Sequence, residues 1–365
     1  MRSLFHIGPK IRVAEIMDCG AVFRYLPSLV PTNLISKVEW EHVVKRADGL
    51  STSILGFEFD LGKSIQQADL LLGIIPNSKA EEAYRNKDNS TPVDSFEAVF
   101  ANHLDKIRNG SIPEASLISM TILEYDVASA GGKLNAPPAV FHGILTQTKG
   151  EPGIRDPQAA GRLAAILASS IGRPVDVQET NAVQKIIADL PSNVRLVWIG
   201  AMPGREPRMI RILLRGLESE SLLENLHQMG WAGPTETVSR VLEVVDGCFE
   251  HLTVQLEISA DGFLPRLGLE IYALNKPDSS SSFANWAAAP DSTPWQPALS
   301  RLEDSGLCLP SKASSLLAFP GREYLYEQGV FEVHKGINHI KISIEDNRAC
   351  TAKAYVGLLF RAAKI

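Results

Sequence analysis

The sequence has few cysteines, no long apolar run and no excess of positive charge, and each shortage excludes a class of protein. The four cysteines among 365 residues stand alone, at positions 19, 248, 308 and 350. Scattered cysteines fit neither a disulfide framework nor a zinc site, and they are typical of a reduced compartment. No apolar stretch approaches the roughly 20 residues of a membrane-spanning helix. The first residues are too interrupted for a signal peptide, so we expect a cytoplasmic protein without membrane contact.

Nucleic acid and several familiar chemistries are also disfavoured. A formal net charge of −6 speaks against nucleic acid as the main partner. The sequence has no P-loop, no Gly-x-Gly-x-x-Gly after a strand, no His-Glu-x-x-His and no Gly-x-Ser-x-Gly. Its eight histidines show no i, i+4 pairing that would indicate a metal site.

What the sequence does have is a series of helices with clear start and stop signals. Asp156 and Pro157 begin one helix, and Gly172 with Pro174 ends it. Further helices are predicted over 181–190, 219–230, 235–245, 295–302 and 312–319.

Between the helices, pairs of strands with period-two alternation are joined by turn residues. The predicted hairpins pair 37–45 with 54–61, 120–127 with 139–145, 194–202 with 209–217, 252–259 with 264–273, and 339–345 with 351–360. They indicate a repeated helix–strand–strand–helix unit. The Ser-rich stretch 276–294 is the one obvious flexible loop. Because it interrupts a unit, we predict a single domain over residues 1–365.

Each predicted strand has one apolar and one polar face, and the helices are amphipathic. The apolar strand faces are the only surfaces large enough to receive the helices, so the polar faces line whatever remains inside. Ten strands seldom stay open without curling. We therefore predict an α+β fold, a closed ten-stranded antiparallel barrel with a polar lumen and surrounding helices. The alternative is an open antiparallel sheet whose polar face meets water.

The predicted polar faces segregate by charge along the chain. His142 also falls on such a face, and we interpret it as a structural side chain. The acids of the first two hairpins are Glu39, Glu41, Glu58, Asp60, Glu124 and Asp126. The bases and tyrosines of the last three hairpins include Arg195, Arg211, Arg215, Arg266, Tyr272, Lys341, Lys353 and Tyr355. A closed sheet would place an acidic wall opposite a basic one.

This architecture resembles the ABBA-type (PT-barrel) aromatic prenyltransferases, in which helix–strand–strand–helix units close as a ten-stranded barrel. The resemblance spans residues from about Leu34 to Phe360 and is architectural. Its nearest local motif is Lys353-Ala-Tyr355, since members of the family place Lys-x-Tyr pairs on lumen strands.

The resemblance implies the transfer of a prenyl group from a soluble prenyl diphosphate to an aromatic, guanidine or peptide side-chain acceptor. Arginine and lysine stabilise the departing diphosphate, tyrosine rings shield the allyl cation, and a carboxylate takes the acceptor's proton. It assigns the diphosphate to Arg211, Arg215, Arg266, Lys341 and Lys353. It assigns cation shielding to Tyr272 and Tyr355, catalysis to Glu39 and Glu58, and acceptor binding to Glu41, Asp60, Glu124 and Asp126.

The acids are more numerous than this family leads us to expect, and the tyrosine count of 7 is low. They would also suit a cationic acceptor, or magnesium, although we expect no required cofactor. Two other functions remain open. One is a non-catalytic peptide-binding protein of a peptide or natural-product pathway, and the other is a cyclase or lyase that uses no diphosphate.

Overall fold

The structure is a computed structural model. It describes residues 4–7, 11–16, 18–27, 29–86, 95–127, 136–145, 153–203, 208–249, 251–272, 292–326, 331–345 and 350–362. Most of the loop expected over 276–294 lies outside these residues. A short hairpin of β1 (Leu4–Ile7) and β2 (Ile11–Ala14) forms its own two-stranded sheet, and the other strands form one large antiparallel sheet.

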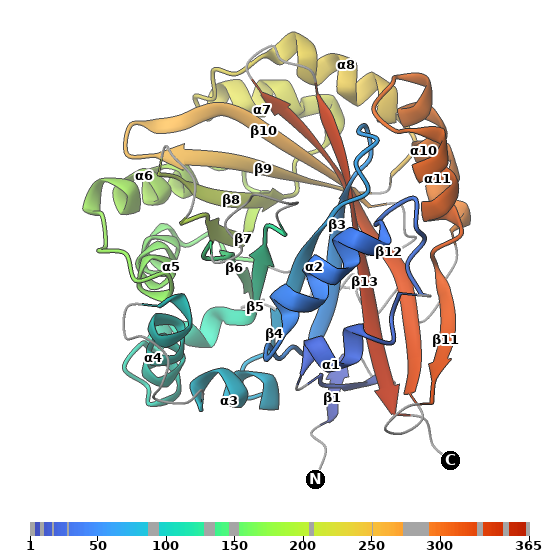
Figure 1. Cartoon of the computed structure of the whole chain (residues 1–365). Coiled ribbons are helices and arrows are strands. Elements are labelled where there is room, and N and C mark those ends of the chain that lie inside the picture. Colours follow the sequence, from blue (N-terminus) through green and yellow to red (C-terminus); the bar gives the residue numbers. More distant parts are fainter. Residues whose placement is uncertain are drawn as a thin grey trace.

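Ten strands of the large sheet close into a barrel (Figure 1). In ring order they are β3 (Ile54–Asp60), β4 (Ala68–Ile74), β5 (Ile118–Tyr125), β6 (Ala139–Ile144), β7 (Arg195–Ala201), β8 (Ile210–Arg215), β9 (His251–Ser259), β10 (Gly262–Tyr272), β12 (Phe331–Glu345) and β13 (Thr351–Ala362). Two pairings complete the ring, β10 with β12 and β13 with β3. An eleventh strand, β11 (Gly321–Leu325), pairs with the other part of β12. The predicted closed barrel and α+β class are confirmed, and the open sheet is excluded.

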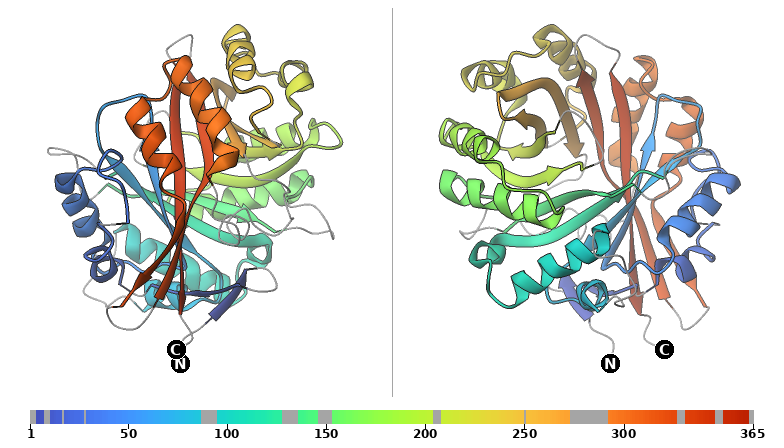
Figure 2. Two further views of the ribbon diagram at one scale, coloured as in Figure 1. Left: turned by 90° about the vertical axis from the view of Figure 1, so that its right-hand side faces the viewer. Right: turned by 60° about the vertical axis from the view of Figure 1, so that its left-hand side comes forward.

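Helices follow the hairpins and lie outside the barrel (Figures 1 and 2). Those before the third hairpin are α1 (Cys19–Phe23), α2 (Lys37–Ala47), α3 (Lys79–Arg85), α4 (Phe96–Arg108), α5 (Pro157–Ser170) and α6 (Val177–Ala188). Those after it are α7 (Leu222–Gln228), α8 (Thr235–Val245), α10 (Gln296–Asp304) and α11 (Pro310–Leu317). Short 3-10 turns occupy Pro113–Leu117, Ser219–Ser221 and Thr293–Trp295.

Local signals explain where several helices begin. Ser36, Ser78 and Ser95 each accept a hydrogen bond from the backbone amide three residues later. Asp156 accepts one from the amide two residues later, and Pro157 occupies the first turn of α5. These caps satisfy amides that have no partner within the helix.

The prediction of a strand over 37–45 is wrong, because these residues form α2. Ser36 caps this segment, and the buried Trp40, Val43 and Ala47 recur at helical spacing on one face. The true partner of β3 is β4, which the sequence analysis did not identify. The other four predicted hairpins are confirmed within a few residues of their ends, apart from β12, which begins eight residues before the predicted strand.

The main core lies between the barrel and the helices. Phe57 points outward from β3 and packs on Phe23 and Trp40, with ring centroids 5.7 to 5.9 Å apart. Two strands along the ring from β3, on β12, Ile340, Ile342 and other outward side chains join the same core. Burial of this continuous apolar layer holds the barrel closed and leaves its inner face free for polar residues.

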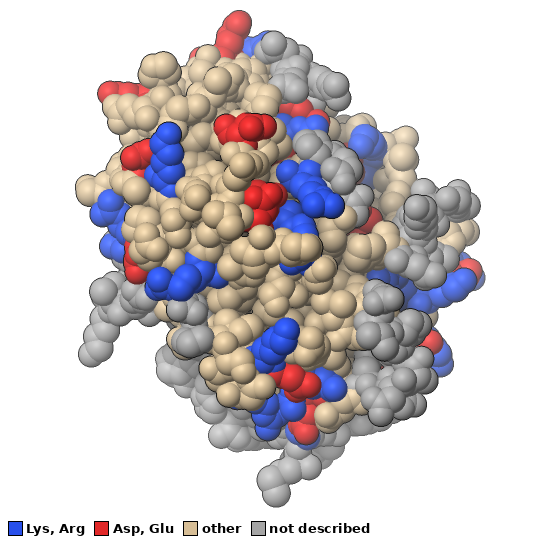
Figure 3. All heavy atoms as spheres, turned by 90° about the vertical axis from the view of Figure 1, so that its left-hand side faces the viewer, with Lys and Arg blue, Asp and Glu red and all other residues tan. Residues whose placement is uncertain are grey.

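On the face shown in Figure 3, lysine and arginine are interspersed with aspartate and glutamate on a largely uncharged surface. Nothing described on this face forms the broad basic patch that nucleic acid would require. Among the described residues, no helix is both long and apolar enough to cross a membrane.

Candidate functional site

Strand alternation determines which side chains point into the barrel. On β13, Ala352, Ala354 and Val356 belong to the outer core, so Lys353 and Tyr355 point inward. The same alternation directs these further charged or aromatic residues inward: Glu58, Asp69, Glu124, Arg211, Arg215, Glu257, Arg266, Glu270, Tyr272, His339 and Lys341. The predicted polar interior is confirmed.

Lys353 and Glu58 form an ion pair in which the ammonium donates to the carboxylate. Only 2% of the Glu58 side chain is exposed. Burial alone would raise the pKa of Glu58, but Lys353 and Lys341 outweigh it and lower that pKa to about 2. Glu58 also raises the pKa of Lys353 against the effect of burial. This pair is therefore charged throughout the physiological pH range.

The expected opposition of an acidic and a basic wall is not what the barrel shows. Closure makes β3 the neighbour of β13, so Tyr355 lies opposite Glu58, and Asp60 lies opposite Lys353. Glu58, from the start of the chain, therefore neutralises Lys353, from its end, across the β3–β13 pairing.

A second charged cluster joins β8, β9 and β10. Arg211 donates to Glu257 Oε1 from Nε at 2.9 Å, and its Nη2 lies 2.7 Å from the same oxygen. Arg266 Nη1 lies 3.6 Å from Glu257 Oε2. One buried carboxylate thus stands between two of the predicted diphosphate ligands.

Lys341 on β12 differs from the other interior cations. It is only 6% exposed, yet within the described ranges its ammonium makes no hydrogen bond and no ion pair. Its nearest ring contact is Tyr355, whose centroid lies 5.9 Å from Nζ. Burial and then Arg211 lower the pKa of Lys341 to about 8, although Glu58, Glu270 and Glu124 act in the opposite direction. Burial and a second cation both disfavour the charged form of this lysine, so a bound anion would stabilise it.

Asp69 is an interior acid that the sequence analysis missed. It lies opposite Glu58 in the β3–β4 register, and its Oδ1 accepts a hydrogen bond from the Val127 amide at 3.1 Å. Burial, followed by Glu58 and Glu124, raises the pKa of Asp69 to about 8. Burial and Glu58 likewise raise the pKa of Glu124. In the sequence, Asp69 is the one acid in the otherwise apolar run 68–75. This run was not recognised as a strand because residues 37–45 were wrongly predicted to be the partner of β3.

The wall formed by β6, β7 and β8 carries an apolar cluster beside the arginines of β8. Phe141, Val197 and Leu213 form a small cluster separate from the main core, and Trp198 packs against it. Gly200 faces the same space, where an added methyl group would overlap the Phe141 ring. The interior therefore holds an apolar patch as well as its charged residues.

The remaining predicted residues lie at the margins of the barrel. Asp60 ends β3, where Oδ1 accepts hydrogen bonds from the amides of Gly62 and Lys63 and Oδ2 pairs with the Lys63 ammonium at 2.8 Å. Asp126 is exposed just beyond β5. Arg215 lies with its guanidinium carbon 6.0 Å from the Tyr272 ring centroid.

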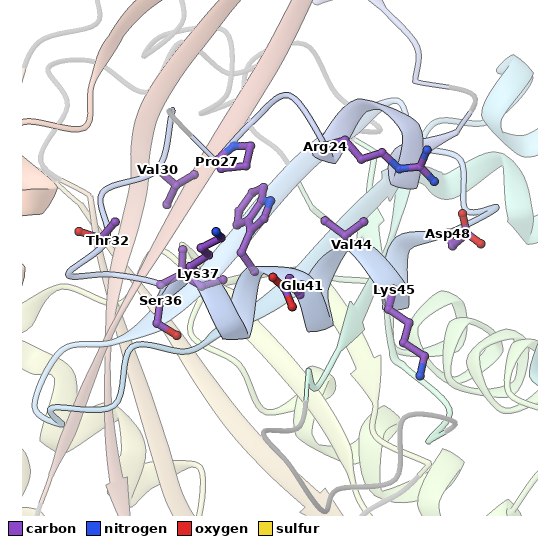
Figure 4. Close-up of a pocket in the computed structure, with 12 residues that line it drawn as sticks. Arg24, Pro27, Val30, Thr32, Ser36, Lys37, Glu41, Val44, Lys45 and Asp48 are labelled. Carbon is purple, nitrogen blue, oxygen red and sulfur yellow. The ribbon is translucent and has the colours of Figure 1, made fainter.

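Glu39 and Glu41 were expected inside the barrel, and this expectation is wrong because both lie on α2. Glu39 Oε2 is 3.4 Å from His42 Nδ1 on the same helix. Glu41 lines an open pocket of about 630 Å³ between α2 and the segment before it, together with Trp40 and Val44 (Figure 4). Neither carboxylate can reach a substrate held inside the barrel.

His142 also points outward, into the core under α4. Its Nδ1 lies 2.9 Å from Thr121 Oγ1, and its ring is 6.1 Å from that of His103. Burial lowers the pKa of His142 to about 3, so it stays neutral. This environment agrees with a structural side chain.

In the described part of the chain, no three His, Cys, Asp or Glu residues are grouped so that they could hold a metal ion. Comparison with models of known protein families finds no match, and comparison with curated proteins finds no significant similarity. The fold and the interior geometry are therefore the basis for inferring function.

Proposed function

We propose that this protein transfers a prenyl group from a soluble prenyl diphosphate to an acceptor held inside the barrel. The observation that carries the proposal is Lys341, a buried ammonium without an ion pair or hydrogen bond in the described residues, next to Arg211. A diphosphate between them would remove the repulsion that these two cations now exert on each other. Lys353 and Arg266 lie on the neighbouring strands.

The chemistry follows from charge development. As the C1–O bond of the prenyl diphosphate breaks, the leaving group takes the electron pair, and fixed cations stabilise it as its charge grows. The allylic cation left behind is stabilised by aromatic faces, and Tyr355 is within 5.9 Å of the Lys341 ammonium. The apolar patch around Phe141 and Trp198 offers a surface for the hydrocarbon chain and excludes water.

The proposal is tested by incubating the full chain with dimethylallyl diphosphate and, in turn, a phenol, an indole and an arginine-containing peptide. Mass spectrometry detects prenylated product, and a coupled assay detects released pyrophosphate. Lys341→Met should reduce both by about 100-fold or more, whereas Lys185→Met, on the exposed face of α6, should change neither. Unchanged activity of Lys341→Met, or no pyrophosphate release by the wild type with any acceptor, would refute the proposal.

A further inference from the structure

Four rings stack across the interior of the barrel on four neighbouring strands. His251 and Tyr272 have centroids 4.6 Å apart, Tyr272 and His339 5.3 Å, and His339 and Tyr355 4.2 Å. The stack crosses β9, β10, β12 and β13 on their inner faces. Its rings are held by one another, so their orientation is fixed before any ligand arrives.

The polar atoms of this stack differ in whether they have hydrogen-bond partners. The Tyr272 hydroxyl donates to Glu270 Oε2 at 3.0 Å, and the Tyr355 side chain hydrogen bonds to Glu58. His339 lies between these two tyrosines, its side chain is 12% exposed, and among the described residues neither of its ring nitrogens has a hydrogen-bond partner. Its Nε2 is 3.9 Å from Glu270 Oε1, which is too far for a hydrogen bond. A buried imidazole with two unbonded nitrogens indicates a site for a ligand group that donates or accepts a proton.

Two of the interior carboxylates are already engaged by cations, whereas this imidazole is not. Glu58 is paired with Lys353, and Glu257 is paired with Arg211. Burial and Glu58 raise the pKa of Glu124. Burial lowers the pKa of His339, which keeps the imidazole neutral and able to accept a proton at neutral pH.

We propose that His339 is the general base of the barrel and that the acceptor is a neutral molecule whose N–H or O–H group donates to this imidazole. This inference rests on the proposed function. The acceptor's electron pair forms the bond to the prenyl carbon, diphosphate leaves with the electron pair of the C–O bond, and the acceptor's proton moves to a ring nitrogen of His339. The imidazolium then faces Glu270 as its counter-ion.

A neutral acceptor follows from the charges around this position. Glu58 is already paired with Lys353, Glu270 already accepts a hydrogen bond from the Tyr272 hydroxyl, and a guanidinium or ammonium group would also meet Lys341 and Lys353. The titratable groups that face His339 are Glu270 and Tyr272 from β10, Lys341 from its own strand, Lys353 and Tyr355 from β13, and Glu58 from β3. The charges of the two acids and the two lysines offset each other, so this position suits a hydrogen-bond donor without charge.

Binding is tested first, because it requires no turnover. Histidine side chains are labelled with ¹⁵N in the full chain, and the resonance of His339 is assigned from its loss in His339→Asn. The probe 1-naphthol should shift this resonance, and its Kd should rise at least tenfold in His339→Asn but not in His227→Asn, a matched change on the exposed end of α7. Agmatine, a guanidinium probe, should not shift it. Equal naphthol binding by His339→Asn, or a stronger response to agmatine, would overturn the inference.

The second measurement separates the base from the transferase chemistry. With dimethylallyl diphosphate and 1-naphthol, His339→Asn should still release pyrophosphate, and water should capture the cation to give the prenyl alcohol, while prenylated naphthol falls by about 100-fold or more. Loss of product in Glu124→Gln instead of His339→Asn would assign the base to Glu124 and refute our proposal. Absence of pyrophosphate release by the wild type would refute the proposed function, and the naphthol titration would then still decide whether His339 binds a neutral donor.

Discussion

Lys353 and Glu58 pair across the one strand pairing that joins the last strand of the barrel to the first, although 295 residues separate them in the sequence. The pair therefore serves two purposes: it neutralises a buried carboxylate and it ties β13 to β3.

Removing the cation of this pair should destabilise the fold. Lys353→Met leaves the Glu58 carboxylate buried without its partner, and we expect a loss of roughly 3 kcal/mol in the free energy of unfolding. Urea unfolding at neutral pH measures it. The double change Lys353→Met with Glu58→Gln should recover much of the loss, because no uncompensated charge remains. A single variant as stable as the wild type would show that the pair contributes nothing.

Asp69 should make the protein less stable as the pH rises. Its folded-state pKa of about 8 exceeds the ordinary value of 3.8. Between these values the folded state binds more protons than the unfolded chain, so stability decreases with increasing pH across this window. Asp69→Asn, which can still accept the bond from the Val127 amide, should be more stable than the wild type at about pH 9, by on the order of 1 kcal/mol or more.

The matched control for this prediction is Asp189→Asn at the exposed end of α6. Its unfolding free energy should follow the wild-type pH profile. If Asp69→Asn also follows that profile between about pH 4 and pH 8, the raised pKa of Asp69 is refuted.

Pyrophosphate binding should reveal the protonation of Lys341. Because its pKa is lowered to about 8, the ammonium loses its proton as the pH rises through that value and affinity for the anion decreases, approaching about tenfold per pH unit. Isothermal titration calorimetry of the wild type and Lys341→Met at several pH values isolates this effect. In the variant, Lys341 no longer contributes, and the pH dependence of affinity comes from the protonation of pyrophosphate itself. Parallel pH profiles for the two proteins would contradict the prediction.

Gly200 should not tolerate a side chain. A methyl group there would overlap the Phe141 ring inside the barrel. Gly200→Ala should therefore cost about 1 to 3 kcal/mol, and Phe141→Leu in the same chain should restore part of it by making space. Thermal unfolding of the wild type and the two variants tests this prediction, and a fully stable Gly200→Ala would show that Phe141 moves freely.

Much of the barrel was predictable because strand alternation and turn residues are local properties. His339–Glu345 and Thr351–Phe360 were recognised from their period of two, and the polar interior followed from asking which face the helices cover. Residues 37–45 were misread because a short amphipathic segment can fit both periods. The Ser36 cap was the signal that distinguishes them.

The candidate site was less predictable, because contacts across the ring depend on closure. Alternation placed Lys341 and Lys353 inside. It could not show that Glu58 would pair with Lys353, or that Lys341 would have no ion pair among the described residues. Nor could it single out His339, whose importance comes from the two rings beside it and from unsatisfied nitrogens. Such relationships join residues that no sequence window contains.

The pairing of β13 with β3 also bears on how the protein is made. During translation, β3 leaves the ribosome early and keeps one bare edge until β13, the last strand of the ring, has been synthesised. Nascent chains therefore carry an exposed, pairing-competent edge for most of their elongation, a condition that favours aggregation. Production in cells should depend on chaperone supply more than the stability of the finished barrel would suggest.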